Sequence, residues 1–285
     1  MAAAHLTEPR NQLPVQVDSN HRRGFYDDGV VCLRGALGAD HLRAARAAWE
    51  WSVSHPGPLA SGLLQDTDGA FQDLCNPRWR GAYETLVRES PLADYAAALW
   101  GAASVWFLYE QVFRKRGGAA GRTPWHQDTS YLALDGEHLV AFWISFESIP
   151  QANALEFVRG SHRAVLYNTS RFDPEDPTLP IAPSDDLPNL PDIEAGRGAF
   201  DIVGFATEPG DVVAFHTSTL HGGGPVDRST PERRTLTLRF FGEDVVSAAR
   251  PGPAGPFYED IQELVPGEPF RHPRFLQVRG AGGDP

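Results

Sequence analysis

Residues 123–131 read TPWHQDTSY, and this stretch decides how the rest of the chain is interpreted. It has the composition of a short strand, and on a strand residues two apart point to the same face. His126 and Asp128 would therefore present an imidazole and a carboxylate side by side. Such a pair is two thirds of a 2-His-1-carboxylate site, which leaves positions open on a non-haem iron(II). A His-x-Asp triplet is also common by chance on surface strands, so this interpretation needs support from other segments.

The third ligand can come from residues 210–225 (GDVVAFHTSTLHGGGP), where an apolar strand leads to a glycine-rich turn. His221 directly precedes the glycines, at a strand end that opens to solvent, and glycine lets the backbone approach a bound group closely. His216 competes for the same role. We favour His221 as the ligand, and we expect His216 to be a hydrogen-bonded structural histidine.

Residues 232–241 (ERRTLTLRFF) alternate polar and apolar side chains, so every second residue shares one face of a strand. Arg233 and Arg239 lie on the same face in this pattern. An arginine on an inward face is costly unless it meets a carboxylate, and a guanidinium is the natural partner of the distal carboxylate of a keto-diacid. Arg233 is either such a residue or part of a solvated face. For Arg234 and Arg239 a solvated face is the plausible interpretation.

The wider pattern around these segments is all-β. From Ser104 onward, short apolar or alternating runs are separated by Gly and Pro, at residues 105–114, 123–131, 139–148, 155–158, 211–216 and 233–241. An irregular stretch rich in Pro, Asp and Gly, residues 167–208, lies between them. A stretch of that length is often a lid or a binding loop.

The N-terminal part reads as helical. Asp40 can cap a helix that ends before His55, and a second helical stretch over 79–99 is divided by Pro91. No linker separates the two halves, so we expect a single domain over 1–285. Its parts are a flexible arm (1–19), a mainly helical buttress (20–103), a β core (104–245) with the lid-like insertion 167–208, and a C-terminal segment (246–285).

Composition narrows the function classes. The net charge of −12 argues against a nucleic-acid partner, which needs a basic face. The chain has no run of 18 apolar residues and does not start like a signal peptide, so we expect neither secretion nor a membrane span. Cys32 and Cys75 are too few for a disulfide framework, which favours a reducing, cytoplasmic location.

Taken together, these segments resemble the phytanoyl-CoA dioxygenase family of iron(II)/2-oxoglutarate oxygenases over about residues 105–241. The resemblance rests on Trp-His-Gln-Asp at 125–128, on Trp143 placed 17 residues after His126, and on LEFVRGSH at 155–162. The last is similar to the family's Leu-x-x-x-Pro-Gly-Ser-His. The GDVVAFHTSTLHG segment and the Arg-Arg-x-Leu-x-Leu strand complete the pattern.

The resemblance implies a mainly β fold with flanking helices, a double-stranded β-helix (jelly-roll, cupin-like) barrel whose mouth holds the iron. It assigns the metal to His126, Asp128 and His221. The residues that it implies around the cosubstrate are Arg233, on the 2-oxoglutarate carboxylate, and Gln111, Lys115, Gln127 and Trp143.

Two details bear on these assignments. Lys115 is the only lysine in the chain and lies 11 residues before His126, where many family members have a lysine. A solvated lysine at a strand end is the alternative. One extra residue separates His221 from Arg233 relative to the family pattern, which leaves Arg234 as the alternative register. Counting back from the aromatic end of the strand favours Arg233.

The resemblance implies hydroxylation of an unactivated C–H bond in a small organic substrate, using iron(II), 2-oxoglutarate and dioxygen and releasing succinate and carbon dioxide. The carboxylate of Asp128 argues for oxygenation, because a small residue there would open a site for halide. One rival is a cupin-type metal protein that does not use 2-oxoglutarate. Another is a non-catalytic binding module, in which the three ligands lie far apart. The sequence leaves open the oligomeric state and the substrate, which is an acyl-CoA, a small amino-acid derivative or a specialised metabolite.

Overall fold

The computed structural model describes residues 15–60, 70–118, 122–168, 170, 176, 178–180, 186–226, 228, 230–250 and 255–280. The helices are α1 (Ser19–Asp28), α2 (Ala39–Ser54), α3 (Arg80–Glu89) and α4 (Leu92–Trp100), and the 3-10 turns are η1 (Asp128–Tyr131), η2 (Gln151–Asn153), η3 (Ser161–Arg163), η4 (Arg197–Ala199) and η5 (Tyr258–Ile261). The strands are β1 (Val30–Leu33), β2 (Ala70–Leu74), β3 (Val105–Arg116), β4 (Thr123–His126), β5 (Leu134–Asp135), β6 (Leu139–Ser145), β7 (Leu155–Val158), β8 (Ile202–Gly204), β9 (Val212–Phe215), β10 (His221–Gly223), β11 (Glu232–Gly242), β12 (Val246–Ser247) and β13 (Gln277–Arg279).

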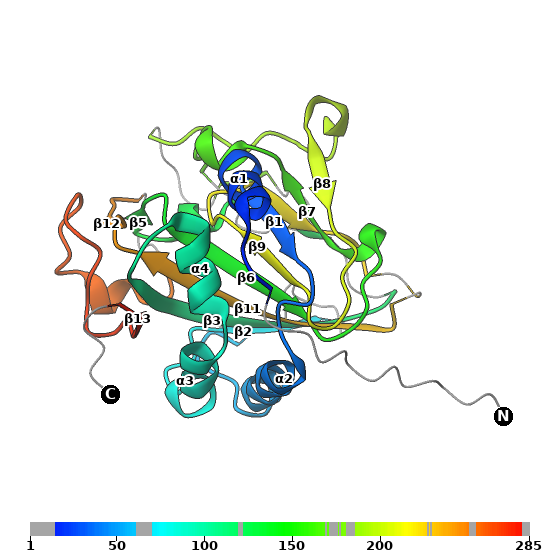
Figure 1. The fold of residues 1–285 in the computed structure, drawn as a ribbon. Coiled ribbons are helices and arrows are strands. Elements are labelled where there is room, and N and C mark those ends of the chain that lie inside the picture. Colours follow the sequence, from blue (N-terminus) through cyan, green and yellow to red (C-terminus); the bar gives the residue numbers. More distant parts are fainter. Residues whose placement is uncertain are drawn as a thin grey trace.

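Two antiparallel sheets form the body of the protein (Figure 1). The larger has the strand order β1-β9-β6-β11-β3-β13, with β2 also paired to β3, and the smaller has the order β4-β10-β7-β8. Apolar side chains of both sheets meet between them. The rings of Phe157 on β7 and Phe215 on β9 lie 5.2 Å apart, in one buried cluster with Trp143 of β6. The predicted double-stranded β-helix with flanking helices is therefore confirmed.

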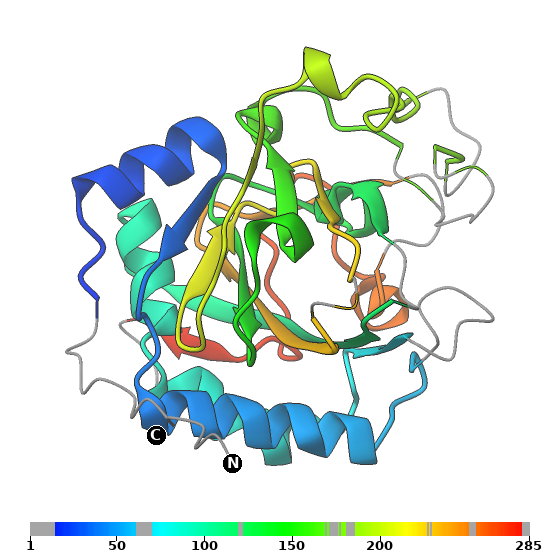
Figure 2. The same ribbon diagram turned by 90° about the vertical axis from the view of Figure 1, so that its right-hand side faces the viewer.

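Helices cover the outer face of the larger sheet, and Figure 2 shows α2 running beneath it. Leu236 and Leu238 of β11 point to this side, where they share a buried cluster with Trp49 of α2 and Tyr83 of α3. As predicted, α3 and α4 are separate helices with Pro91 between them. Because proline lacks an N–H, it is tolerated at a helix start and ends the helix before it.

Several strands join the larger sheet from outside the predicted β core. β1 pairs with β9, while β2 and β13 both pair with β3. Neither β2 nor β13 was predicted from the sequence. Of the predicted arm 1–19, residues 1–14 lie outside the described residues, and α1 already begins at Ser19 with Asp18 as its cap. Strands from both ends of the chain thus complete one sheet.

The segment expected to be a lid divides into two parts. Residues 186–200 pack onto the outer side of the smaller sheet, where Leu190 and Ile193 share a buried cluster with Trp125, and the chain then joins that sheet as β8. Since Trp125 and His126 are neighbours on β4, their side chains point to opposite faces. This part therefore forms an outer layer, because its own apolar residues are buried there. Much of 169–185 lies outside the described residues.

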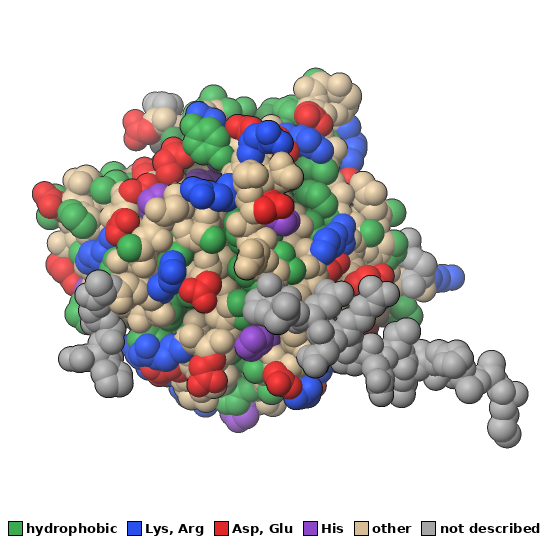
Figure 3. Space-filling view, in the orientation of Figure 1, with side chains coloured by type: hydrophobic (Ala, Val, Ile, Leu, Met, Phe, Trp, Pro, Cys, Tyr) green, Lys and Arg blue, Asp and Glu red, His purple; other side chains and the backbone are tan. Residues whose placement is uncertain are grey.

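The surface carries mixed charge. On the face shown in Figure 3, basic and acidic side chains are interspersed, with no continuous basic area. None of the described helices has the length and hydropathy needed to cross a membrane.

Candidate metal centre

The three predicted metal ligands converge in the smaller sheet. His126 ends β4 and His221 begins β10, and the two are direct partners in the antiparallel ladder. Gln127 keeps extended backbone angles before η1 begins, so the strand alternation still reaches Asp128 although the ladder has ended. One donor atom from each of the three side chains lies within 4.8 Å of the others, and all three residues are buried. The binding-module rival, which required them to be far apart, does not fit this geometry.

Both imidazoles are oriented by the backbone. Nδ1 of His126 lies 2.8 Å from the carbonyl oxygen of Pro124, and Nδ1 of His221 lies 2.8 Å from that of Thr219. Because a carbonyl can only accept, each Nδ1 carries the proton and each Nε2 presents a lone pair. The Nε2 atoms lie 3.6 and 3.9 Å from Oδ1 of Asp128. Burial, and then the neighbouring His126, lowers the pKa of His221 to about 3, so its ring is neutral at pH 7.

Asp128 is held by an arginine that the sequence analysis assigned to a solvated face. Nε and Nη2 of Arg239 lie 2.9 and 2.8 Å from Oδ2 of Asp128. Burial alone would raise the pKa of Asp128, but the Arg239 guanidinium and then the two histidines hold it well below its usual range. That interpretation of Arg239 was therefore wrong. The sequence did indicate that Arg239 shares a strand face with Arg233. The structure shows that this face is buried, so Arg239 needs a carboxylate partner.

The donor set fits a divalent first-row metal. Two imidazole nitrogens and one ionised carboxylate oxygen converge from one side, which is the arrangement of non-haem iron(II) sites with open positions. Phe157 and Phe215 pack beside the His221 ring, with centroids 6.0 and 4.6 Å away. These aromatic side chains cover part of the His221 ring with apolar surface.

A pair of buried basic residues lies in the larger sheet, close to the β4–β10 ladder that carries the two histidines. Arg233 and Lys115 are partners across β11 and β3, and their residues are only 4% and 2% exposed. Nζ of Lys115 donates to Oγ1 of Thr123, which pairs with Gly223 two residues beyond His221. Two residues span about 7 Å along a strand. The cations therefore lie beside the metal-ligand cluster at a distance that suits a short dicarboxylate.

Arg233 and Arg234 have different surroundings. Among the described residues, the Arg233 guanidinium donates to the backbone oxygen of Asn153, and burial alone lowers its pKa to about 10. Arg234 lies on the opposite side of β11, where its guanidinium is paired with Glu147. Arg233 is thus the inward arginine whose charge no described carboxylate compensates.

For the other three residues predicted around the cosubstrate, the structure shows contacts with other parts of the protein. Trp143 is buried between the sheets. Gln111 accepts a hydrogen bond from Nη2 of Arg239 at 2.8 Å. Gln127 donates to the backbone oxygens of Val165 and Ser218 and accepts from the N–H of Tyr167. Cosubstrate contacts of these three residues remain predictions.

His216 lies outside the cluster of metal-ligating side chains. Its Nε2 lies 3.2 Å from the carbonyl oxygen of Gly136, and its Nδ1 accepts from the N–H of Ser218 at 3.1 Å. Burial, and then the neighbouring His162, lowers its pKa to about 3. These contacts are those of the structural histidine that the sequence analysis expected.

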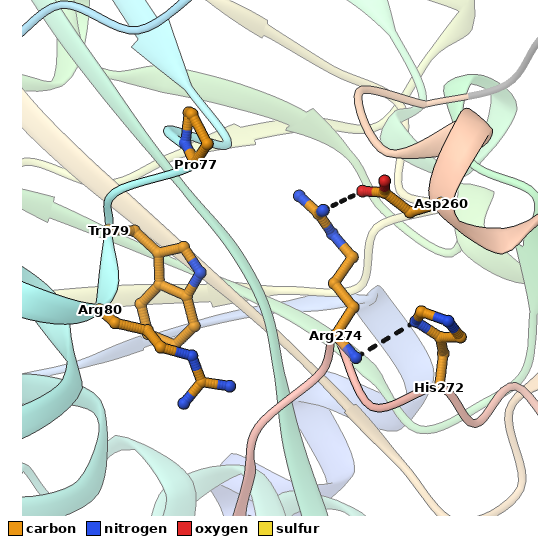
Figure 4. A pocket seen from close by; sticks show the side chains of 6 residues that line it. All are labelled: Pro77, Trp79, Arg80, Asp260, His272 and Arg274. Carbon is orange, nitrogen blue, oxygen red and sulfur yellow. Dashed lines mark hydrogen bonds and ion pairs between the residues drawn. The ribbon is translucent and has the colours of Figure 1, made fainter.

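A hollow opens on the surface beside α3 (Figure 4). Its charged side chains already have partners, because Arg274 is paired with Asp260 and Arg80 lies 3.6 Å from Glu84. It shares no residue with the metal-ligand cluster. We therefore treat the cluster around His126 as the candidate site.

Comparison with known proteins agrees with this geometry. The family model for phytanoyl-CoA dioxygenase (PhyH) matches residues 25–235. No curated protein matches the sequence. Among solved structures, the non-heme alpha ketoglutarate-dependent carbocyclase SnoK from nogalamycin biosynthesis is 20% identical, with a TM-score of 0.69 over 94% of this chain and 100% of that one.

Two further similar structures contain bound groups. The epimerase SnoN, in complex with Fe3+, alpha ketoglutarate and nogalamycin RO, is 18% identical, with a TM-score of 0.65 over 90% of this chain and 97% of that one. EvdO2 from Micromonospora carbonacea var. aurantiaca, complexed with 2-oxoglutarate, is 19% identical, with a TM-score of 0.55 over 85% of this chain and 97% of that one. At this level of identity the likeness shows a common fold.

Proposed function

The chain belongs to the phytanoyl-CoA dioxygenase family, and we propose that it is an iron(II)- and 2-oxoglutarate-dependent dioxygenase that hydroxylates an unactivated C–H bond of a small organic substrate. Iron and 2-oxoglutarate are its cofactor and cosubstrate. One observation carries the proposal. A cluster of two histidines and one aspartate, all buried, lies beside two buried basic residues that are suited to a dicarboxylate.

Each part of the site has a proposed role. His126, Asp128 and His221 hold the metal, and Arg233 binds the distal carboxylate of 2-oxoglutarate, with Lys115 as a second cationic partner. When bound, iron together with 2-oxoglutarate and dioxygen supplies the oxidising chemistry and releases succinate and carbon dioxide. The protein fixes the orientation of both imidazoles and keeps the carboxylate ionised. It also keeps the cosubstrate anchored while one substrate C–H bond is positioned.

The type of reaction that the substrate undergoes has a second candidate besides hydroxylation. SnoK and SnoN are described as a carbocyclase and an epimerase, so this fold also carries reactions in which no hydroxyl group is added. Ring closure or epimerisation is therefore the alternative to hydroxylation. Product mass separates them, because hydroxylation adds one oxygen atom, ring closure by C–H oxidation removes two hydrogens, and epimerisation leaves the mass unchanged.

For the substrate class we propose a specialised metabolite. The net charge of −12 and the single lysine, which is buried between the sheets, provide no obvious basic cradle for the phosphates of an acyl-CoA. The similar SnoN structure contains nogalamycin RO, and SnoK is described as an enzyme of nogalamycin biosynthesis. The strands that both ends of the chain add to one sheet favour a single domain, and the free Cys32 and Cys75 favour a cytoplasmic location.

Succinate formation tests the proposal. The iron-loaded protein is incubated with 2-oxoglutarate and a panel of acyl-CoAs, amino-acid derivatives and polyketide or sugar metabolites, and succinate and product are measured by mass spectrometry. We expect succinate with the wild-type protein and at most background with His221→Ala. The exposed His55→Ala serves as the matched control and should behave as wild type. Metal binding without succinate in any arm would favour the cupin-type rival.

A further inference from the structure

Arg239 contacts a single carboxylate oxygen of the metal-ligand cluster through two of its nitrogens, one by a hydrogen bond and one by an ion pair. It lies on β11 opposite Tyr109 of β3 and Ala141 of β6, and the residue is 3% exposed. Both its Nε and its Nη2 reach Oδ2 of Asp128. The other oxygen, Oδ1, is the one nearest to the two imidazole Nε2 atoms. Arg239 thus binds Oδ2 of Asp128, whereas Oδ1 faces the two histidines.

We propose that Arg239 is a positioning residue that makes Asp128 a one-oxygen metal ligand, and that Gln111 holds Arg239 in place. The inference rests on the proposed metal centre. A carboxylate that can rotate freely can chelate a metal through both oxygens and then occupies two coordination positions. The charge-assisted hydrogen bond from Nε and the ion-pair contact of Nη2, both to Oδ2, oppose that rotation. On a six-coordinate ion the three protein ligands then leave three positions, as chelating 2-oxoglutarate and dioxygen require.

Further contacts hold the guanidinium itself. Nη2 of Arg239 donates to Oε1 of Gln111, and Nε2 of Gln111 donates in turn to Oε1 of Gln72 at 3.3 Å. The guanidinium carbon lies 4.6 Å above the Tyr109 ring. β2 and β3 of the larger sheet thus fix the direction of an arginine that acts on a ligand next to the smaller sheet. This gives Gln111 a function that does not depend on touching the cosubstrate.

The arrangement is costly in stability. Nη1 of Arg239 is buried without a hydrogen-bond partner among the described residues. A buried donor left without a partner is unfavourable, and buried ion pairs are often no more stabilising than apolar residues of similar volume. The pair is therefore poorly explained as a source of stability, whereas a role in orienting a metal ligand accounts for its geometry.

The number of water molecules bound to the metal tests the inference. Mn(II) is loaded into the wild-type protein, Arg239→Gln, Gln111→Leu and the matched control Arg234→Gln, and inner-sphere water is counted by water-proton relaxation. We expect three waters for wild type and Arg234→Gln, two for Arg239→Gln, and an intermediate mean for Gln111→Leu. Circular dichroism checks folding. If Arg239→Gln does not fold, the milder Gln111→Leu decides the question.

The outcomes separate the two proposals. Three waters in Arg239→Gln, or in Gln111→Leu if that variant has to decide, overturn the inference while the metal centre stands. A wild-type protein that binds no Mn(II) and no Fe(II) overturns the proposed function, and the inference with it. A loss of water that is equally large in Arg234→Gln shows a general effect of removing arginine from β11, and also overturns the positioning role.

Discussion

Lys115 and Arg233 lie opposite each other in the β3–β11 ladder, and both are almost completely buried. Two like charges held together away from water are unfavourable unless an anion joins them. The sole lysine of the chain and the first inward residue of β11 therefore mark the end of the site where a dicarboxylate would bind.

The first prediction concerns Arg233. Replacing it with Ala removes charge-assisted bonds of about 1.5–3 kcal/mol each, so the apparent Michaelis constant for 2-oxoglutarate should rise about tenfold or more. Metal affinity should change little. Arg234→Ala, which removes the outward neighbour paired with Glu147, is the control and should be near wild type. A large effect in Arg234→Ala with a near-normal Arg233→Ala would contradict the assignment.

Cosubstrate binding should take up a proton through Lys115. Burial, then Arg233 and then Arg122, lowers the pKa of Lys115 from 10.5 to about 7. A bound carboxylate favours the ammonium and raises that pKa, so above pH 7 the affinity for 2-oxoglutarate should fall by up to about tenfold per pH unit. Calorimetry at pH 8 in buffers of different ionisation enthalpy measures the uptake. Lys115→Met should abolish it, and equal heats in all buffers for wild type would refute the linkage.

The absence of a side chain at Gly223 should be needed for Arg233, Lys115 and Thr123 to bind the carboxylate of 2-oxoglutarate. A Cβ at this position would lie 2.8 Å from Oγ1 of Thr123 and 3.4 Å from Nη2 of Arg233. Gly223→Ala should therefore displace Thr123 from Lys115 and raise the Michaelis constant for 2-oxoglutarate several-fold. Gly198→Ala is the control, since a Cβ there meets nothing within 4 Å. If Gly223→Ala and Gly198→Ala have the same Michaelis constant for 2-oxoglutarate, the residues around Gly223 can make room for a methyl group and the prediction is wrong.

The turn that carries Asp128 is tied to the start of the long insertion. Gln127 bonds to the backbone of Val165 and Tyr167, and Oγ of Ser130 donates to the carbonyl oxygen of Tyr167 at 2.8 Å. If this segment forms a wall of the substrate site, Ser130→Ala and Gln127→Leu should increase the ratio of succinate to oxidised product. Metal binding should persist. Ser54→Ala, on the exposed side of α2, is the control. If the ratio of succinate to oxidised product is unchanged in both variants, these hydrogen bonds do not help to couple succinate formation to substrate oxidation.

Glu110 should make the protein less stable at higher pH. Burial raises its pKa from 4.5 to about 7. Because the folded pKa lies above the unfolded one, ionisation is disfavoured in the folded state, and stability should be lost as pH rises from about 4.5 through 7, by roughly 3 kcal/mol at most. Denaturant unfolding at pH 5 and pH 8 measures this loss. Glu110→Gln, which keeps the acceptor for the N–H of Asn76, should lose less; an equal loss would assign the dependence to other groups.

The sequence by itself determined the parts of the site that follow local rules. Strand alternation placed the side chains of His126 and Asp128 together, because the backbone stays extended up to Asp128. The glycines after His221 marked a strand end, and the alternating pattern of β11 placed Arg233 and Arg234 on opposite faces. The alternation of side chains along a strand and the preference of glycine for turns depend on only a few neighbouring residues. They can therefore be recognised in the sequence before the pairing of the strands is known.

Only the tertiary structure decided which polar faces are buried and what they meet. Arg239 shares its face with Arg233, yet its role depends on Asp128, which lies 111 residues earlier in the chain. The same holds for Gln111, which contacts Arg239, and for residues 186–200, whose apolar side chains pack against Trp125 on an outer face. Such contacts exist only after two sheets have packed. The physical reason is that burial turns a charged side chain from a solvated group into one that requires a specific partner.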